Sequence, residues 1–286
     1  ARIRSGAYLS QNNLFDKHHV PIDRLINPEQ VVTDQITELL SHPGALEVLD
    51  FAEGRVQLVA MRAYLGGPLV GQALRFLSEH MPNIDTRVAA IFRRGQPIIP
   101  TGDTVIETDD EVFFIAAREH ITAVMGELRK AEKPYRRVII AGGGNIGTRL
   151  ANDTEDNYDV RIMEVNPERA QNLADQLNQA VVIQGSATDR DLLLEENIDQ
   201  CDAFCAVTDD DEINVMSSLM AKRLGARQVV TLIGKPAYVD LVQGSEIDVA
   251  ISPQQATIGT LLSYVRRADV ALSLIHISEP TRLRHI

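Results

Sequence analysis

One short glycine-rich segment constrains the fold of this chain more than any other feature of its sequence. Gly142, Gly144 and Gly147 follow the apolar run Val138–Ala141 and begin a segment with helical spacing. Glycines spaced in this way between a strand and a helix allow a tight turn, close approach of a pyrophosphate and close packing of the helix on the strand. We therefore expect a phosphate site at the start of that helix. The alternative is a tight strand–helix turn that binds no ligand.

Short apolar runs alternate with helical patterns from this loop to about residue 252. Six runs predict strands, at residues 137–141, 159–166, 180–185, 202–208, 228–233 and 247–252. Two sets of apolar residues between them have helical spacing, namely Ala170, Leu173, Ala174 and Leu177, and then Ile213, Met216, Met220 and Leu224. The alternation is typical of an α/β fold, here a Rossmann-like doubly wound parallel sheet.

The middle of the chain, residues 43–130, has a different pattern and predicts a small α+β domain. Arg55–Leu65 and Val88–Ala117 read as strands joined by turns. Pro68–Met81, which lies between them, reads as a helix. The doubly wound domain is then expected to occupy residues 131–270.

A repeated phrase indicates that the chain contains parts of two similar units. "IDRLINPEQ" (Ile22–Gln30) and "IDVAISPQQ" (Ile247–Gln255) agree in five of their positions, in the same register. We interpret residues 1–42 as the C-terminal remnant of another doubly wound domain, with its last two strands, whose own glycine loop would lie upstream. Chance similarity of two strand–turn patterns is the alternative. Residues 271–286 fit no part of this scheme, and we interpret them as a non-native tail.

Glu164 ends the second predicted strand, 22 residues after Gly142. A carboxylate in this position accepts hydrogen bonds from the ribose hydroxyls of a dinucleotide and repels a 2′-phosphate. The sequence therefore favours NAD(H), or an adenine nucleotide with a free ribose, over NADP(H). A solvated glutamate at the end of a strand is the alternative.

Polar residues also follow the third and fourth predicted strands. Ser186 and Ala187 lie where the edge of an adenine ring is expected, although their segment also has the composition of a helix N-terminal cap. Thr208 and Asp209 begin an acidic segment that opens a helix. Acidic residues there complement the helix dipole, so capping, contact with a nucleotide and a cation site all remain open.

The composition argues against two classes of partner. The formal net charge is −12 and no run of basic residues is longer than two, so we expect no binding to nucleic acid. The apolar runs are far shorter than the roughly 18 residues of a membrane span, so we expect no direct membrane insertion. Cys201 and Cys205 are expected to be core thiols of a protein in a reducing cytoplasm.

The residues needed for turnover are not evident. No histidine lies between Ile121 and Ile275, and the sequence has no arrangement that suggests a positioned acid or base. Hydride transfer requires such a group. We therefore expect a protein that binds a nucleotide without catalysis, and an NAD-dependent oxidoreductase is the alternative.

Longer phrases of the chain resemble one known family, the bacterial Trk-system potassium-uptake regulators or TrkA family. The resemblance covers about residues 1–270. It rests on five phrases, which are "GGGNIG" (142–147), "EENID" (195–199), "TDDDEINVMSSLMAKRLGA" (208–226), "AYVDLVQGSEIDVAISPQQATIGTLL" (237–262) and "HMPNIDTRVAAIFRRGQPIIPTGDTVIETDDEVFFIAA" (80–117). Members of that family contain two RCK units, each a Rossmann-like nucleotide domain followed by a small C-terminal domain.

The resemblance implies a function, partners and a set of ligand residues. The protein would form a homo-oligomeric ring in the cytoplasm, on the inner face of the inner membrane, beneath a membrane-embedded Trk-type potassium channel subunit. NAD(H) and ATP or ADP would bind to it and regulate the flux of potassium. By motif position, the implied ligand residues are Gly142, Gly143, Gly144, Asn145, Ile146, Glu164, Thr208 and Asp209, with Arg2 at the nucleotide site of the first unit. Ser186 stands where the family usually has aspartate.

Overall fold

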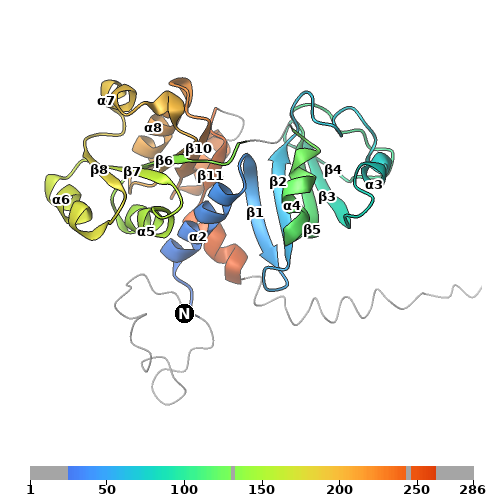
Figure 1. The fold of residues 1–286 in the computed structure, drawn as a ribbon, viewed down its shortest axis with the longest axis horizontal. Coiled ribbons are helices and arrows are strands. Elements are labelled where there is room, and N and C mark those ends of the chain that lie inside the picture. The colour runs from blue at the N-terminus through green and yellow to red at the C-terminus, as the bar shows by residue number, and fades with distance from the viewer. Residues whose placement is uncertain (1–24, 130–132, 243–245, 262–286) are drawn as a thin grey trace, which may run out of the picture.

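The computed structural model describes residues 25–129, 133–242 and 246–261, which form two sheets with a helix between them (Figure 1). One sheet has six strands and the other has five. Residues 1–24, which contain most of the two strands predicted within residues 1–42, lie outside the described residues, as do Arg2 and the tail at residues 271–286.

The six-stranded sheet is parallel, with the order β11-β10-β9-β6-β7-β8. The chain runs outward from β6 to β8, returns to the other side of β6 and runs outward again to β11. The central strands β6, β9 and β10 are almost entirely apolar and buried, because helices cover both faces of the sheet. This topology confirms the predicted doubly wound fold. The strands are β6 (Arg137–Ala141), β7 (Asp159–Glu164), β8 (Val181–Gln184), β9 (Ala203–Ala206), β10 (Gln228–Leu232) and β11 (Val249–Ile251).

Helices connect these strands, with α7 and α8 above the sheet in Figure 1 and α5 and α6 below it. The order of the strands reverses between β6 and β9. The carboxyl ends of these two strands therefore flank the crevice in which doubly wound domains bind their ligands. The helices are α5 (Asn145–Thr154), α6 (Pro167–Gln176), α7 (Arg190–Glu195), α8 (Asp211–Arg223) and α9 (Pro236–Val242), with a 3₁₀ turn at Ile198–Gln200.

Helix α8 packs on the sheet mainly through small and polar side chains, and only some of the apolar residues that mark it are buried. Its buried side chains are small or polar, and they are Asp211, Asn214, Ser217, Ser218 and Ala221. Ile213 is 41% exposed and Met216 is 56% exposed. Small side chains let the helix approach β9 and β10 closely, while Met220 and Leu224 are partly buried and pack against the apolar core. The apolar spacing therefore identified the helix but only part of its buried face. In α6 the prediction holds for Ala170 and Leu173, which are buried, and fails for Ala174, which is exposed.

The five-stranded sheet is antiparallel, with the order β1-β2-β5-β3-β4. It has β1 at its edge, a strand that the sequence pattern did not reveal. The predicted helix at Pro68–Met81 is wrong over its first half. Val70 and Ala73 form bridges to Ile106 and Val105, so only residues 74–80 are helical. The elements are β1 (Ala45–Phe51), β2 (Val56–Arg62), a 3₁₀ turn at Leu74–Phe76, α3 (Leu77–His80), β3 (Thr86–Arg93), β4 (Gln96–Ile98), β5 (Glu111–Ala117), a 3₁₀ turn at Arg118–His120 and α4 (Ile121–Gly126).

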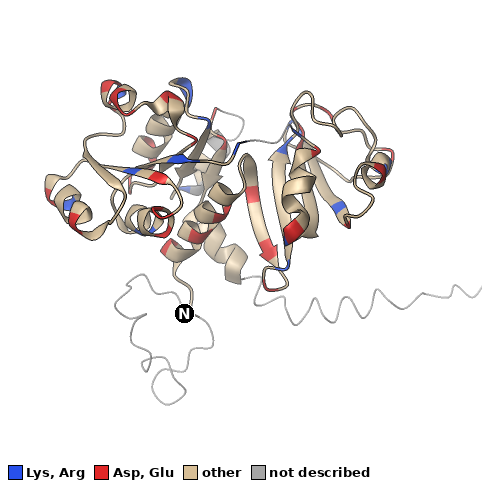
Figure 2. Ribbon diagram, in the orientation of Figure 1, with Lys and Arg blue, Asp and Glu red and all other residues tan. Residues whose placement is uncertain are grey.

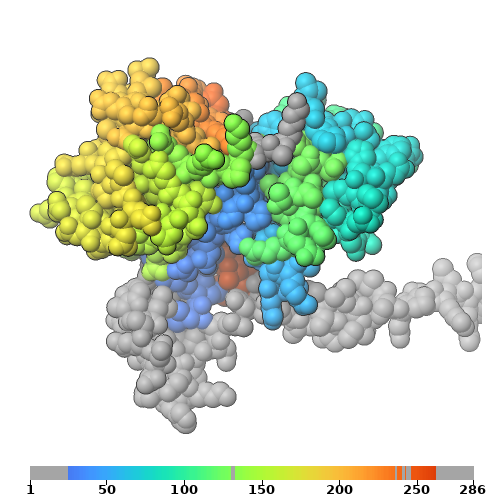
Figure 3. Space-filling view, viewed as in Figure 1, coloured from blue at the N-terminus to red at the C-terminus, as the bar shows by residue number. Residues whose placement is uncertain are grey.

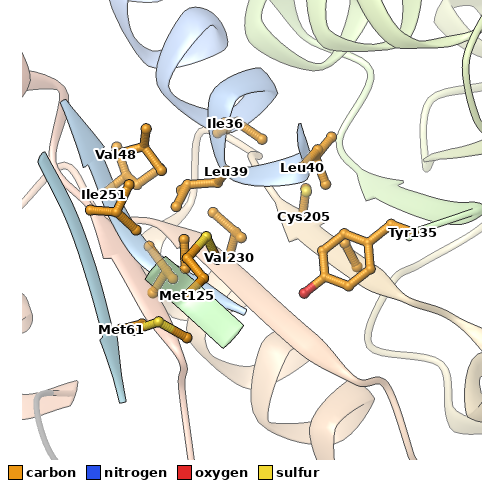
Figure 4. Packing of buried hydrophobic residues seen from close by; sticks show 14 of the residues in the cluster. Ile36, Leu39, Leu40, Val48, Met61, Met125, Tyr135, Cys205, Val230 and Ile251 are labelled. Atoms are coloured by element: carbon orange, nitrogen blue, oxygen red, sulfur yellow. The ribbon is translucent and has the colours of Figure 1, made fainter. Parts of the chain in front are cut away.

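Helix α2 (Pro28–Ser41), which the sequence reading did not identify, lies between the two sheets (Figure 3). Its buried residues Ile36 and Leu39 pack in one cluster with Val48 of β1 and Ile251 of β11 (Figure 4). The two sheets therefore share one apolar core through this helix.

The repeated phrase begins a helix at both of its positions. In the first copy, the Oδ1 atom of Asn27 accepts hydrogen bonds from the N–H groups of Glu29 and Gln30, and Pro28 is the first helical residue. In the second copy, Ser252 occupies the corresponding position and Pro253 starts a helix at residues 253–261. Proline suits the first helical position because its missing N–H would have no partner there.

Candidate functional site

The glycine loop between β6 and α5 is held in its conformation by close backbone contacts. Gly142 has a φ of +108°, and a Cβ there would lie 2.9 Å from three atoms of Thr208. A Cβ on Gly147 would overlap the carbonyl oxygen of Gly142, and one on Gly143 would overlap Leu173. The backbone contacts of Gly142 and Gly147 therefore require glycine at these two positions, whereas a side chain at Gly143 would displace the flexible side chain of Leu173.

Gly144 differs from the other three, because a Cβ on it would meet no protein atom within 4 Å. Its φ of −75° and ψ of −168° are accessible to any residue. The packing of the described residues thus gives no reason for a glycine here. A ligand that needs close access to the backbone is such a reason, and the space around Gly144 fits a phosphate group.

Helix α5 begins at this opening without a side-chain cap. Gly144 is its N-cap residue, and no side chain of the described residues hydrogen-bonds to the first N–H groups of the helix. By contrast, Asn166, Asp189 and Asp210 cap α6, α7 and α8. The first N–H groups of a helix carry a partial positive charge and bind anions. The N–H groups at Asn145 and Ile146 are thus available to a phosphate.

Glu164 lies directly beneath the loop, and the alternative of a solvated strand-end glutamate is wrong. It is 4% exposed. The N–H of Gly143 donates to its Oε2 atom (3.0 Å), and the N–H of Asn166 donates to its Oε1 atom (2.7 Å). The side chain of Arg169 also donates to Oε1 (3.0 Å). The carboxylate is therefore fixed at the carboxyl end of β7, next to the glycine loop.

Thr208 follows β9 and faces the glycine loop across the reversal of strand order. Its N–H and its Oγ1 both donate to the Oδ1 atom of Asn214, at 2.9 and 2.6 Å. The Nδ2 atom of Asn214 donates in turn to the carbonyl oxygens of Thr208 and Leu232 (3.0 Å each). Asn214 is fully buried and fixes the loops after β9 and β10 relative to each other. It is a residue that the sequence reading missed, since it lies inside a helix without a motif of its own.

The carboxylates of the acidic segment after Thr208 have different hydrogen-bond partners. Asp210 caps α8 by accepting from the N–H of Ile213, which confirms the capping interpretation. Asp211 is buried and accepts from the N–H groups of Gly234 and Lys235 in the loop after β10. Asp209 is exposed. Among the described residues, no group of three or more His, Cys, Asp or Glu side chains is arranged to hold a metal ion.

Ser186 and Ala187 lie in the loop after β8. The Oγ atom of Ser186 contacts the Oγ1 of Thr188 (2.9 Å) and accepts from its N–H (3.2 Å), so it shapes the loop. The cap of α7 is Asp189, which accepts from the N–H groups of Asp191 and Leu192. The N–H of Gly185 also donates to the carbonyl oxygen of Glu164, which ties this loop to the end of β7.

The structure thus brings three predicted features together at one edge of the sheet, which are the glycine loop, Glu164 and Thr208. Both cysteines are buried, as expected, and burial raises the pKa of the Cys201 thiol to about 12. Lys and Arg residues lie scattered along the described chain (Figure 2). No helix within the described ranges has the length and apolar character needed to cross a bilayer.

Two domain families match the chain. Residues 58–129 match the TrkA-C domain family, and residues 138–253 match the TrkA-N domain family. The first match covers much of the antiparallel sheet, and the second covers the parallel sheet.

Similar proteins of known name include several bacterial potassium-uptake proteins. The Trk system potassium uptake protein TrkA of Halomonas elongata is 64% identical over 270 residues, which are 94% of this chain and 59% of that protein. The proteins of the same name from Vibrio alginolyticus and Haemophilus influenzae are 59% and 50% identical, over 94% of this chain and 59% of theirs. The chain therefore spans about three fifths of the length of these relatives.

Solved structures share the fold at low sequence identity. The GsuK channel is 16% identical, covers 92% of this chain and 46% of its own, and has a TM-score of 0.62. The RCK domain of GsuK is 18% identical, covers 88% of this chain and 54% of its own, and has a TM-score of 0.60. The GsuK channel bound to NAD is 17% identical, covers 85% of this chain and 43% of its own, and has a TM-score of 0.57.

Proposed function

The chain belongs to the TrkA family of Trk-system potassium-uptake proteins, and on that premise we propose that it is part of a nucleotide-binding regulatory subunit of a membrane potassium channel. Its site at residues 142–147 would bind the nucleotide, and this binding would change the potassium flux through the channel. The observation that carries this proposal is the uncapped start of α5 beside the open position at Gly144.

The proposed ligand is NAD(H), with ATP or ADP as the other candidate. Both contain phosphates that the N–H groups at the start of α5 would bind, and a ribose that Glu164 would bind. Thr208 closes the site from the β9 side, where the Asn214 side chain holds its backbone. Support for this ligand class comes from the GsuK channel, whose structure with bound NAD shares the fold.

We propose that the site binds its ligand without turnover. A dehydrogenase would need a proton donor or acceptor next to the reacting carbon. The described residues around the glycine loop present glycines, a buried glutamate whose oxygens both accept hydrogen bonds, and a threonine held by Asn214. An NAD-dependent oxidoreductase would reveal itself by steady consumption of NADH with a carbonyl substrate.

The proposed architecture is a tandem of two units, with residues 25–42 and the small domain belonging to the first. A contact between helices α2 and α5 supports this proposal. The side chain of Arg149 on α5 donates to the Oε1 atom of Gln30 on α2 (2.6 Å), so the end of the first unit contacts the helix that follows the glycine loop of the second. We further propose that the whole protein forms a homo-oligomeric ring on the cytoplasmic face of the inner membrane, beneath the channel.

The test uses a full-length protein that contains this chain, together with its purified channel. Nucleotide affinity is measured by calorimetry with and without the channel, and potassium flux is measured in liposomes. A regulatory ligand shifts an equilibrium only by its difference in affinity between two states, and typical couplings are about 5- to 150-fold. By linkage, the channel must change nucleotide affinity by the same factor as the nucleotide changes channel binding. If the nucleotide affinity were the same with and without the channel, and NADH and ATP did not change the potassium flux, the protein would bind nucleotide but would not regulate the channel through it.

A further inference from the structure

An arginine lies on the carboxylate that is proposed to bind the ribose. The Nη2 atom of Arg169 is 3.0 Å from the Oε1 atom of Glu164. The side chain of Arg169 is 57% exposed, whereas that of Glu164 is 5% exposed. The exposed arginine therefore lies on the solvent side of the buried carboxylate, and a ribose that approached Oε1 from solvent would meet it.

Glu164 does not depend on Arg169 for its position. Two backbone N–H groups, those of Gly143 and Asn166, already bind one carboxylate oxygen each. Asn166 is itself fixed as the N-cap of α6, where its Oδ1 accepts from the N–H of Arg169 (2.9 Å). Loss of the Arg169 side chain would thus leave the carboxylate in place, with its charge unpaired.

The hydrogen bonds of the carboxylate show what the arginine occupies. Among the described residues, the Oε1 atom has two donors, Asn166 and Arg169, and Oε2 has one, Gly143. A ribose presents two adjacent hydroxyl groups, and a carboxylate binds them best with an acceptor site free on each oxygen. The guanidinium of Arg169 occupies the acceptor site on Oε1 that a ribose hydroxyl would use.

The same guanidinium changes the electrostatics of the site. A bare glutamate repels a 2′-phosphate, and an arginine nearby accommodates one. Arg169 has exposed N–H groups beyond the one bound to Glu164, because guanidinium carries five donors. The site therefore combines a feature that favours a free ribose with a feature that tolerates a phosphorylated ribose.

We propose that Arg169 is a specificity-determining residue, which competes with the ribose for Glu164 and reduces the preference for a free 2′-hydroxyl over a 2′-phosphate. This inference rests on the proposed nucleotide site. It makes an unusual prediction, which is that removal of a cationic residue tightens the binding of an anionic ligand.

The experiment measures the affinities of NADH and NADPH by calorimetry for the chain and for Arg169→Gln. The matched control is Arg223→Gln, which removes another exposed arginine that is paired with a carboxylate, Glu246, at the opposite end of α8 from Thr208. Because the Arg169 side of the pair is open to solvent, we scale the effect to that of an exposed ion pair, which contributes up to about 1 kcal/mol, or roughly fivefold in affinity. We expect Arg169→Gln to bind NADH about threefold more tightly and NADPH about threefold more weakly, with the control unchanged.

Three outcomes would overturn the inference, and they differ from one another. Weaker NADH binding by Arg169→Gln would mean that the arginine contacts the ligand and does not compete with it. An unchanged ratio of the NADH and NADPH affinities would mean that the Arg169–Glu164 ion pair has no influence on ligand specificity. If the folded wild-type chain bound neither nucleotide, the proposed site itself would fail. If NADPH binding were too weak to measure in both proteins, the NADH affinity alone would test the inference. Tighter binding by Arg169→Gln would support it, and equal or weaker binding would contradict it.

Discussion

The two ends of helix α5 are built in opposite ways. At its C-terminal end, the carboxylate of Glu155 accepts hydrogen bonds from three consecutive N–H groups, those of Asn178, Gln179 and Ala180. At its N-terminal end, the first N–H groups have no side-chain partner within the part of the chain that the structure describes, and they lie next to the open position at Gly144. The backbone N–H groups of residues 178–180, before β8, thus have an acceptor in Glu155. The first N–H groups of α5, at the carboxyl end of the sheet, have no such side-chain acceptor among the described residues. The difference indicates that the C-terminal end of α5 serves stability and the N-terminal end serves binding.

The largest expected effect comes from the glycine that the fold itself requires. Gly147→Ala places a Cβ onto the carbonyl oxygen of Gly142, and neither backbone can move without opening the loop. Overpacking costs about 1–3 kcal/mol and sometimes more, and we expect the loss here to exceed 3 kcal/mol. Urea unfolding measures it. Gly144→Ala is the matched control and should retain the stability of the wild type, and equal destabilisation by the two changes would refute the contrast between these glycines.

Glu155→Ala tests the closed end of the helix. The substitution removes the charged acceptor of three part-buried hydrogen bonds. A hydrogen bond to a charged group contributes about 1.5–3 kcal/mol, but water can replace the carboxylate in part at the exposed residues Asn178 and Gln179, so we expect a total loss of about 3 kcal/mol. Asp156→Ala is the control, since Asp156 is exposed and its Oδ1 accepts a hydrogen bond from the side chain of Gln179, not from a backbone N–H group. The affinity for NADH should stay within about twofold of the wild type in the protein that remains folded. A large loss of affinity with intact stability would reverse the roles assigned to the two ends.

Asn214→Ala should affect both properties. It removes the acceptor for the N–H and hydroxyl of Thr208 and the donor for the carbonyl of Leu232. We expect a loss of about 2 kcal/mol in unfolding free energy. We also expect several-fold weaker nucleotide binding, because the loop beside the glycine turn loses its support. Asn152→Ala, on the exposed side of α5, serves as the control. A stability loss without any change in affinity would remove Thr208 from the site.

Much of the fold could be predicted from local patterns. The glycine spacing and the alternation of apolar runs with helices specify a parallel sheet, because both depend on residues close together in sequence. The loop, Glu164 and Thr208 could be placed at one edge for the same reason, since carboxyl ends of parallel strands meet there.

Other features depend on contacts between residues far apart in sequence. The buried face of α8 is polar because Asn214 and Asp211 bind backbone groups of the loops after β9 and β10. The burial of Glu164 depends on the N–H of Gly143, 21 residues away. Helix α2 has its apolar partners on both sheets. No periodicity within a segment encodes such partners, so the sequence pattern could not reveal them.

The smallest expected effect is on the pH dependence of stability. Burial acts to raise the pKa of Glu155, but the hydrogen bonds from Gln179, Ala180 and Asn178 outweigh it, and the pKa lies below its ordinary value. The unfolded chain therefore takes up the proton first, at about pH 4.3, and the stabilisation by Glu155 is complete above that pH and declines as the pH falls through the folded pKa. Glu155→Gln should lack this pH-dependent stabilisation. The difference in unfolding free energy between the variant and the wild type should therefore become smaller in acid. A difference that is independent of pH would show that Glu155 does not titrate in this way.

The most direct test of the binding edge is the affinity of Gly144→Val for NADH and ATP, measured by calorimetry beside the wild type. A Cβ at this position meets no atom of the described residues within 4 Å, and the valine side chain would extend into the space proposed for a phosphate. We predict that the melting temperature and circular dichroism stay unchanged while the affinity falls well over tenfold, which corresponds to more than about 1.4 kcal/mol. A folded variant that binds both nucleotides as tightly as the wild type would contradict the assignment of the free end of α5 as the nucleotide site.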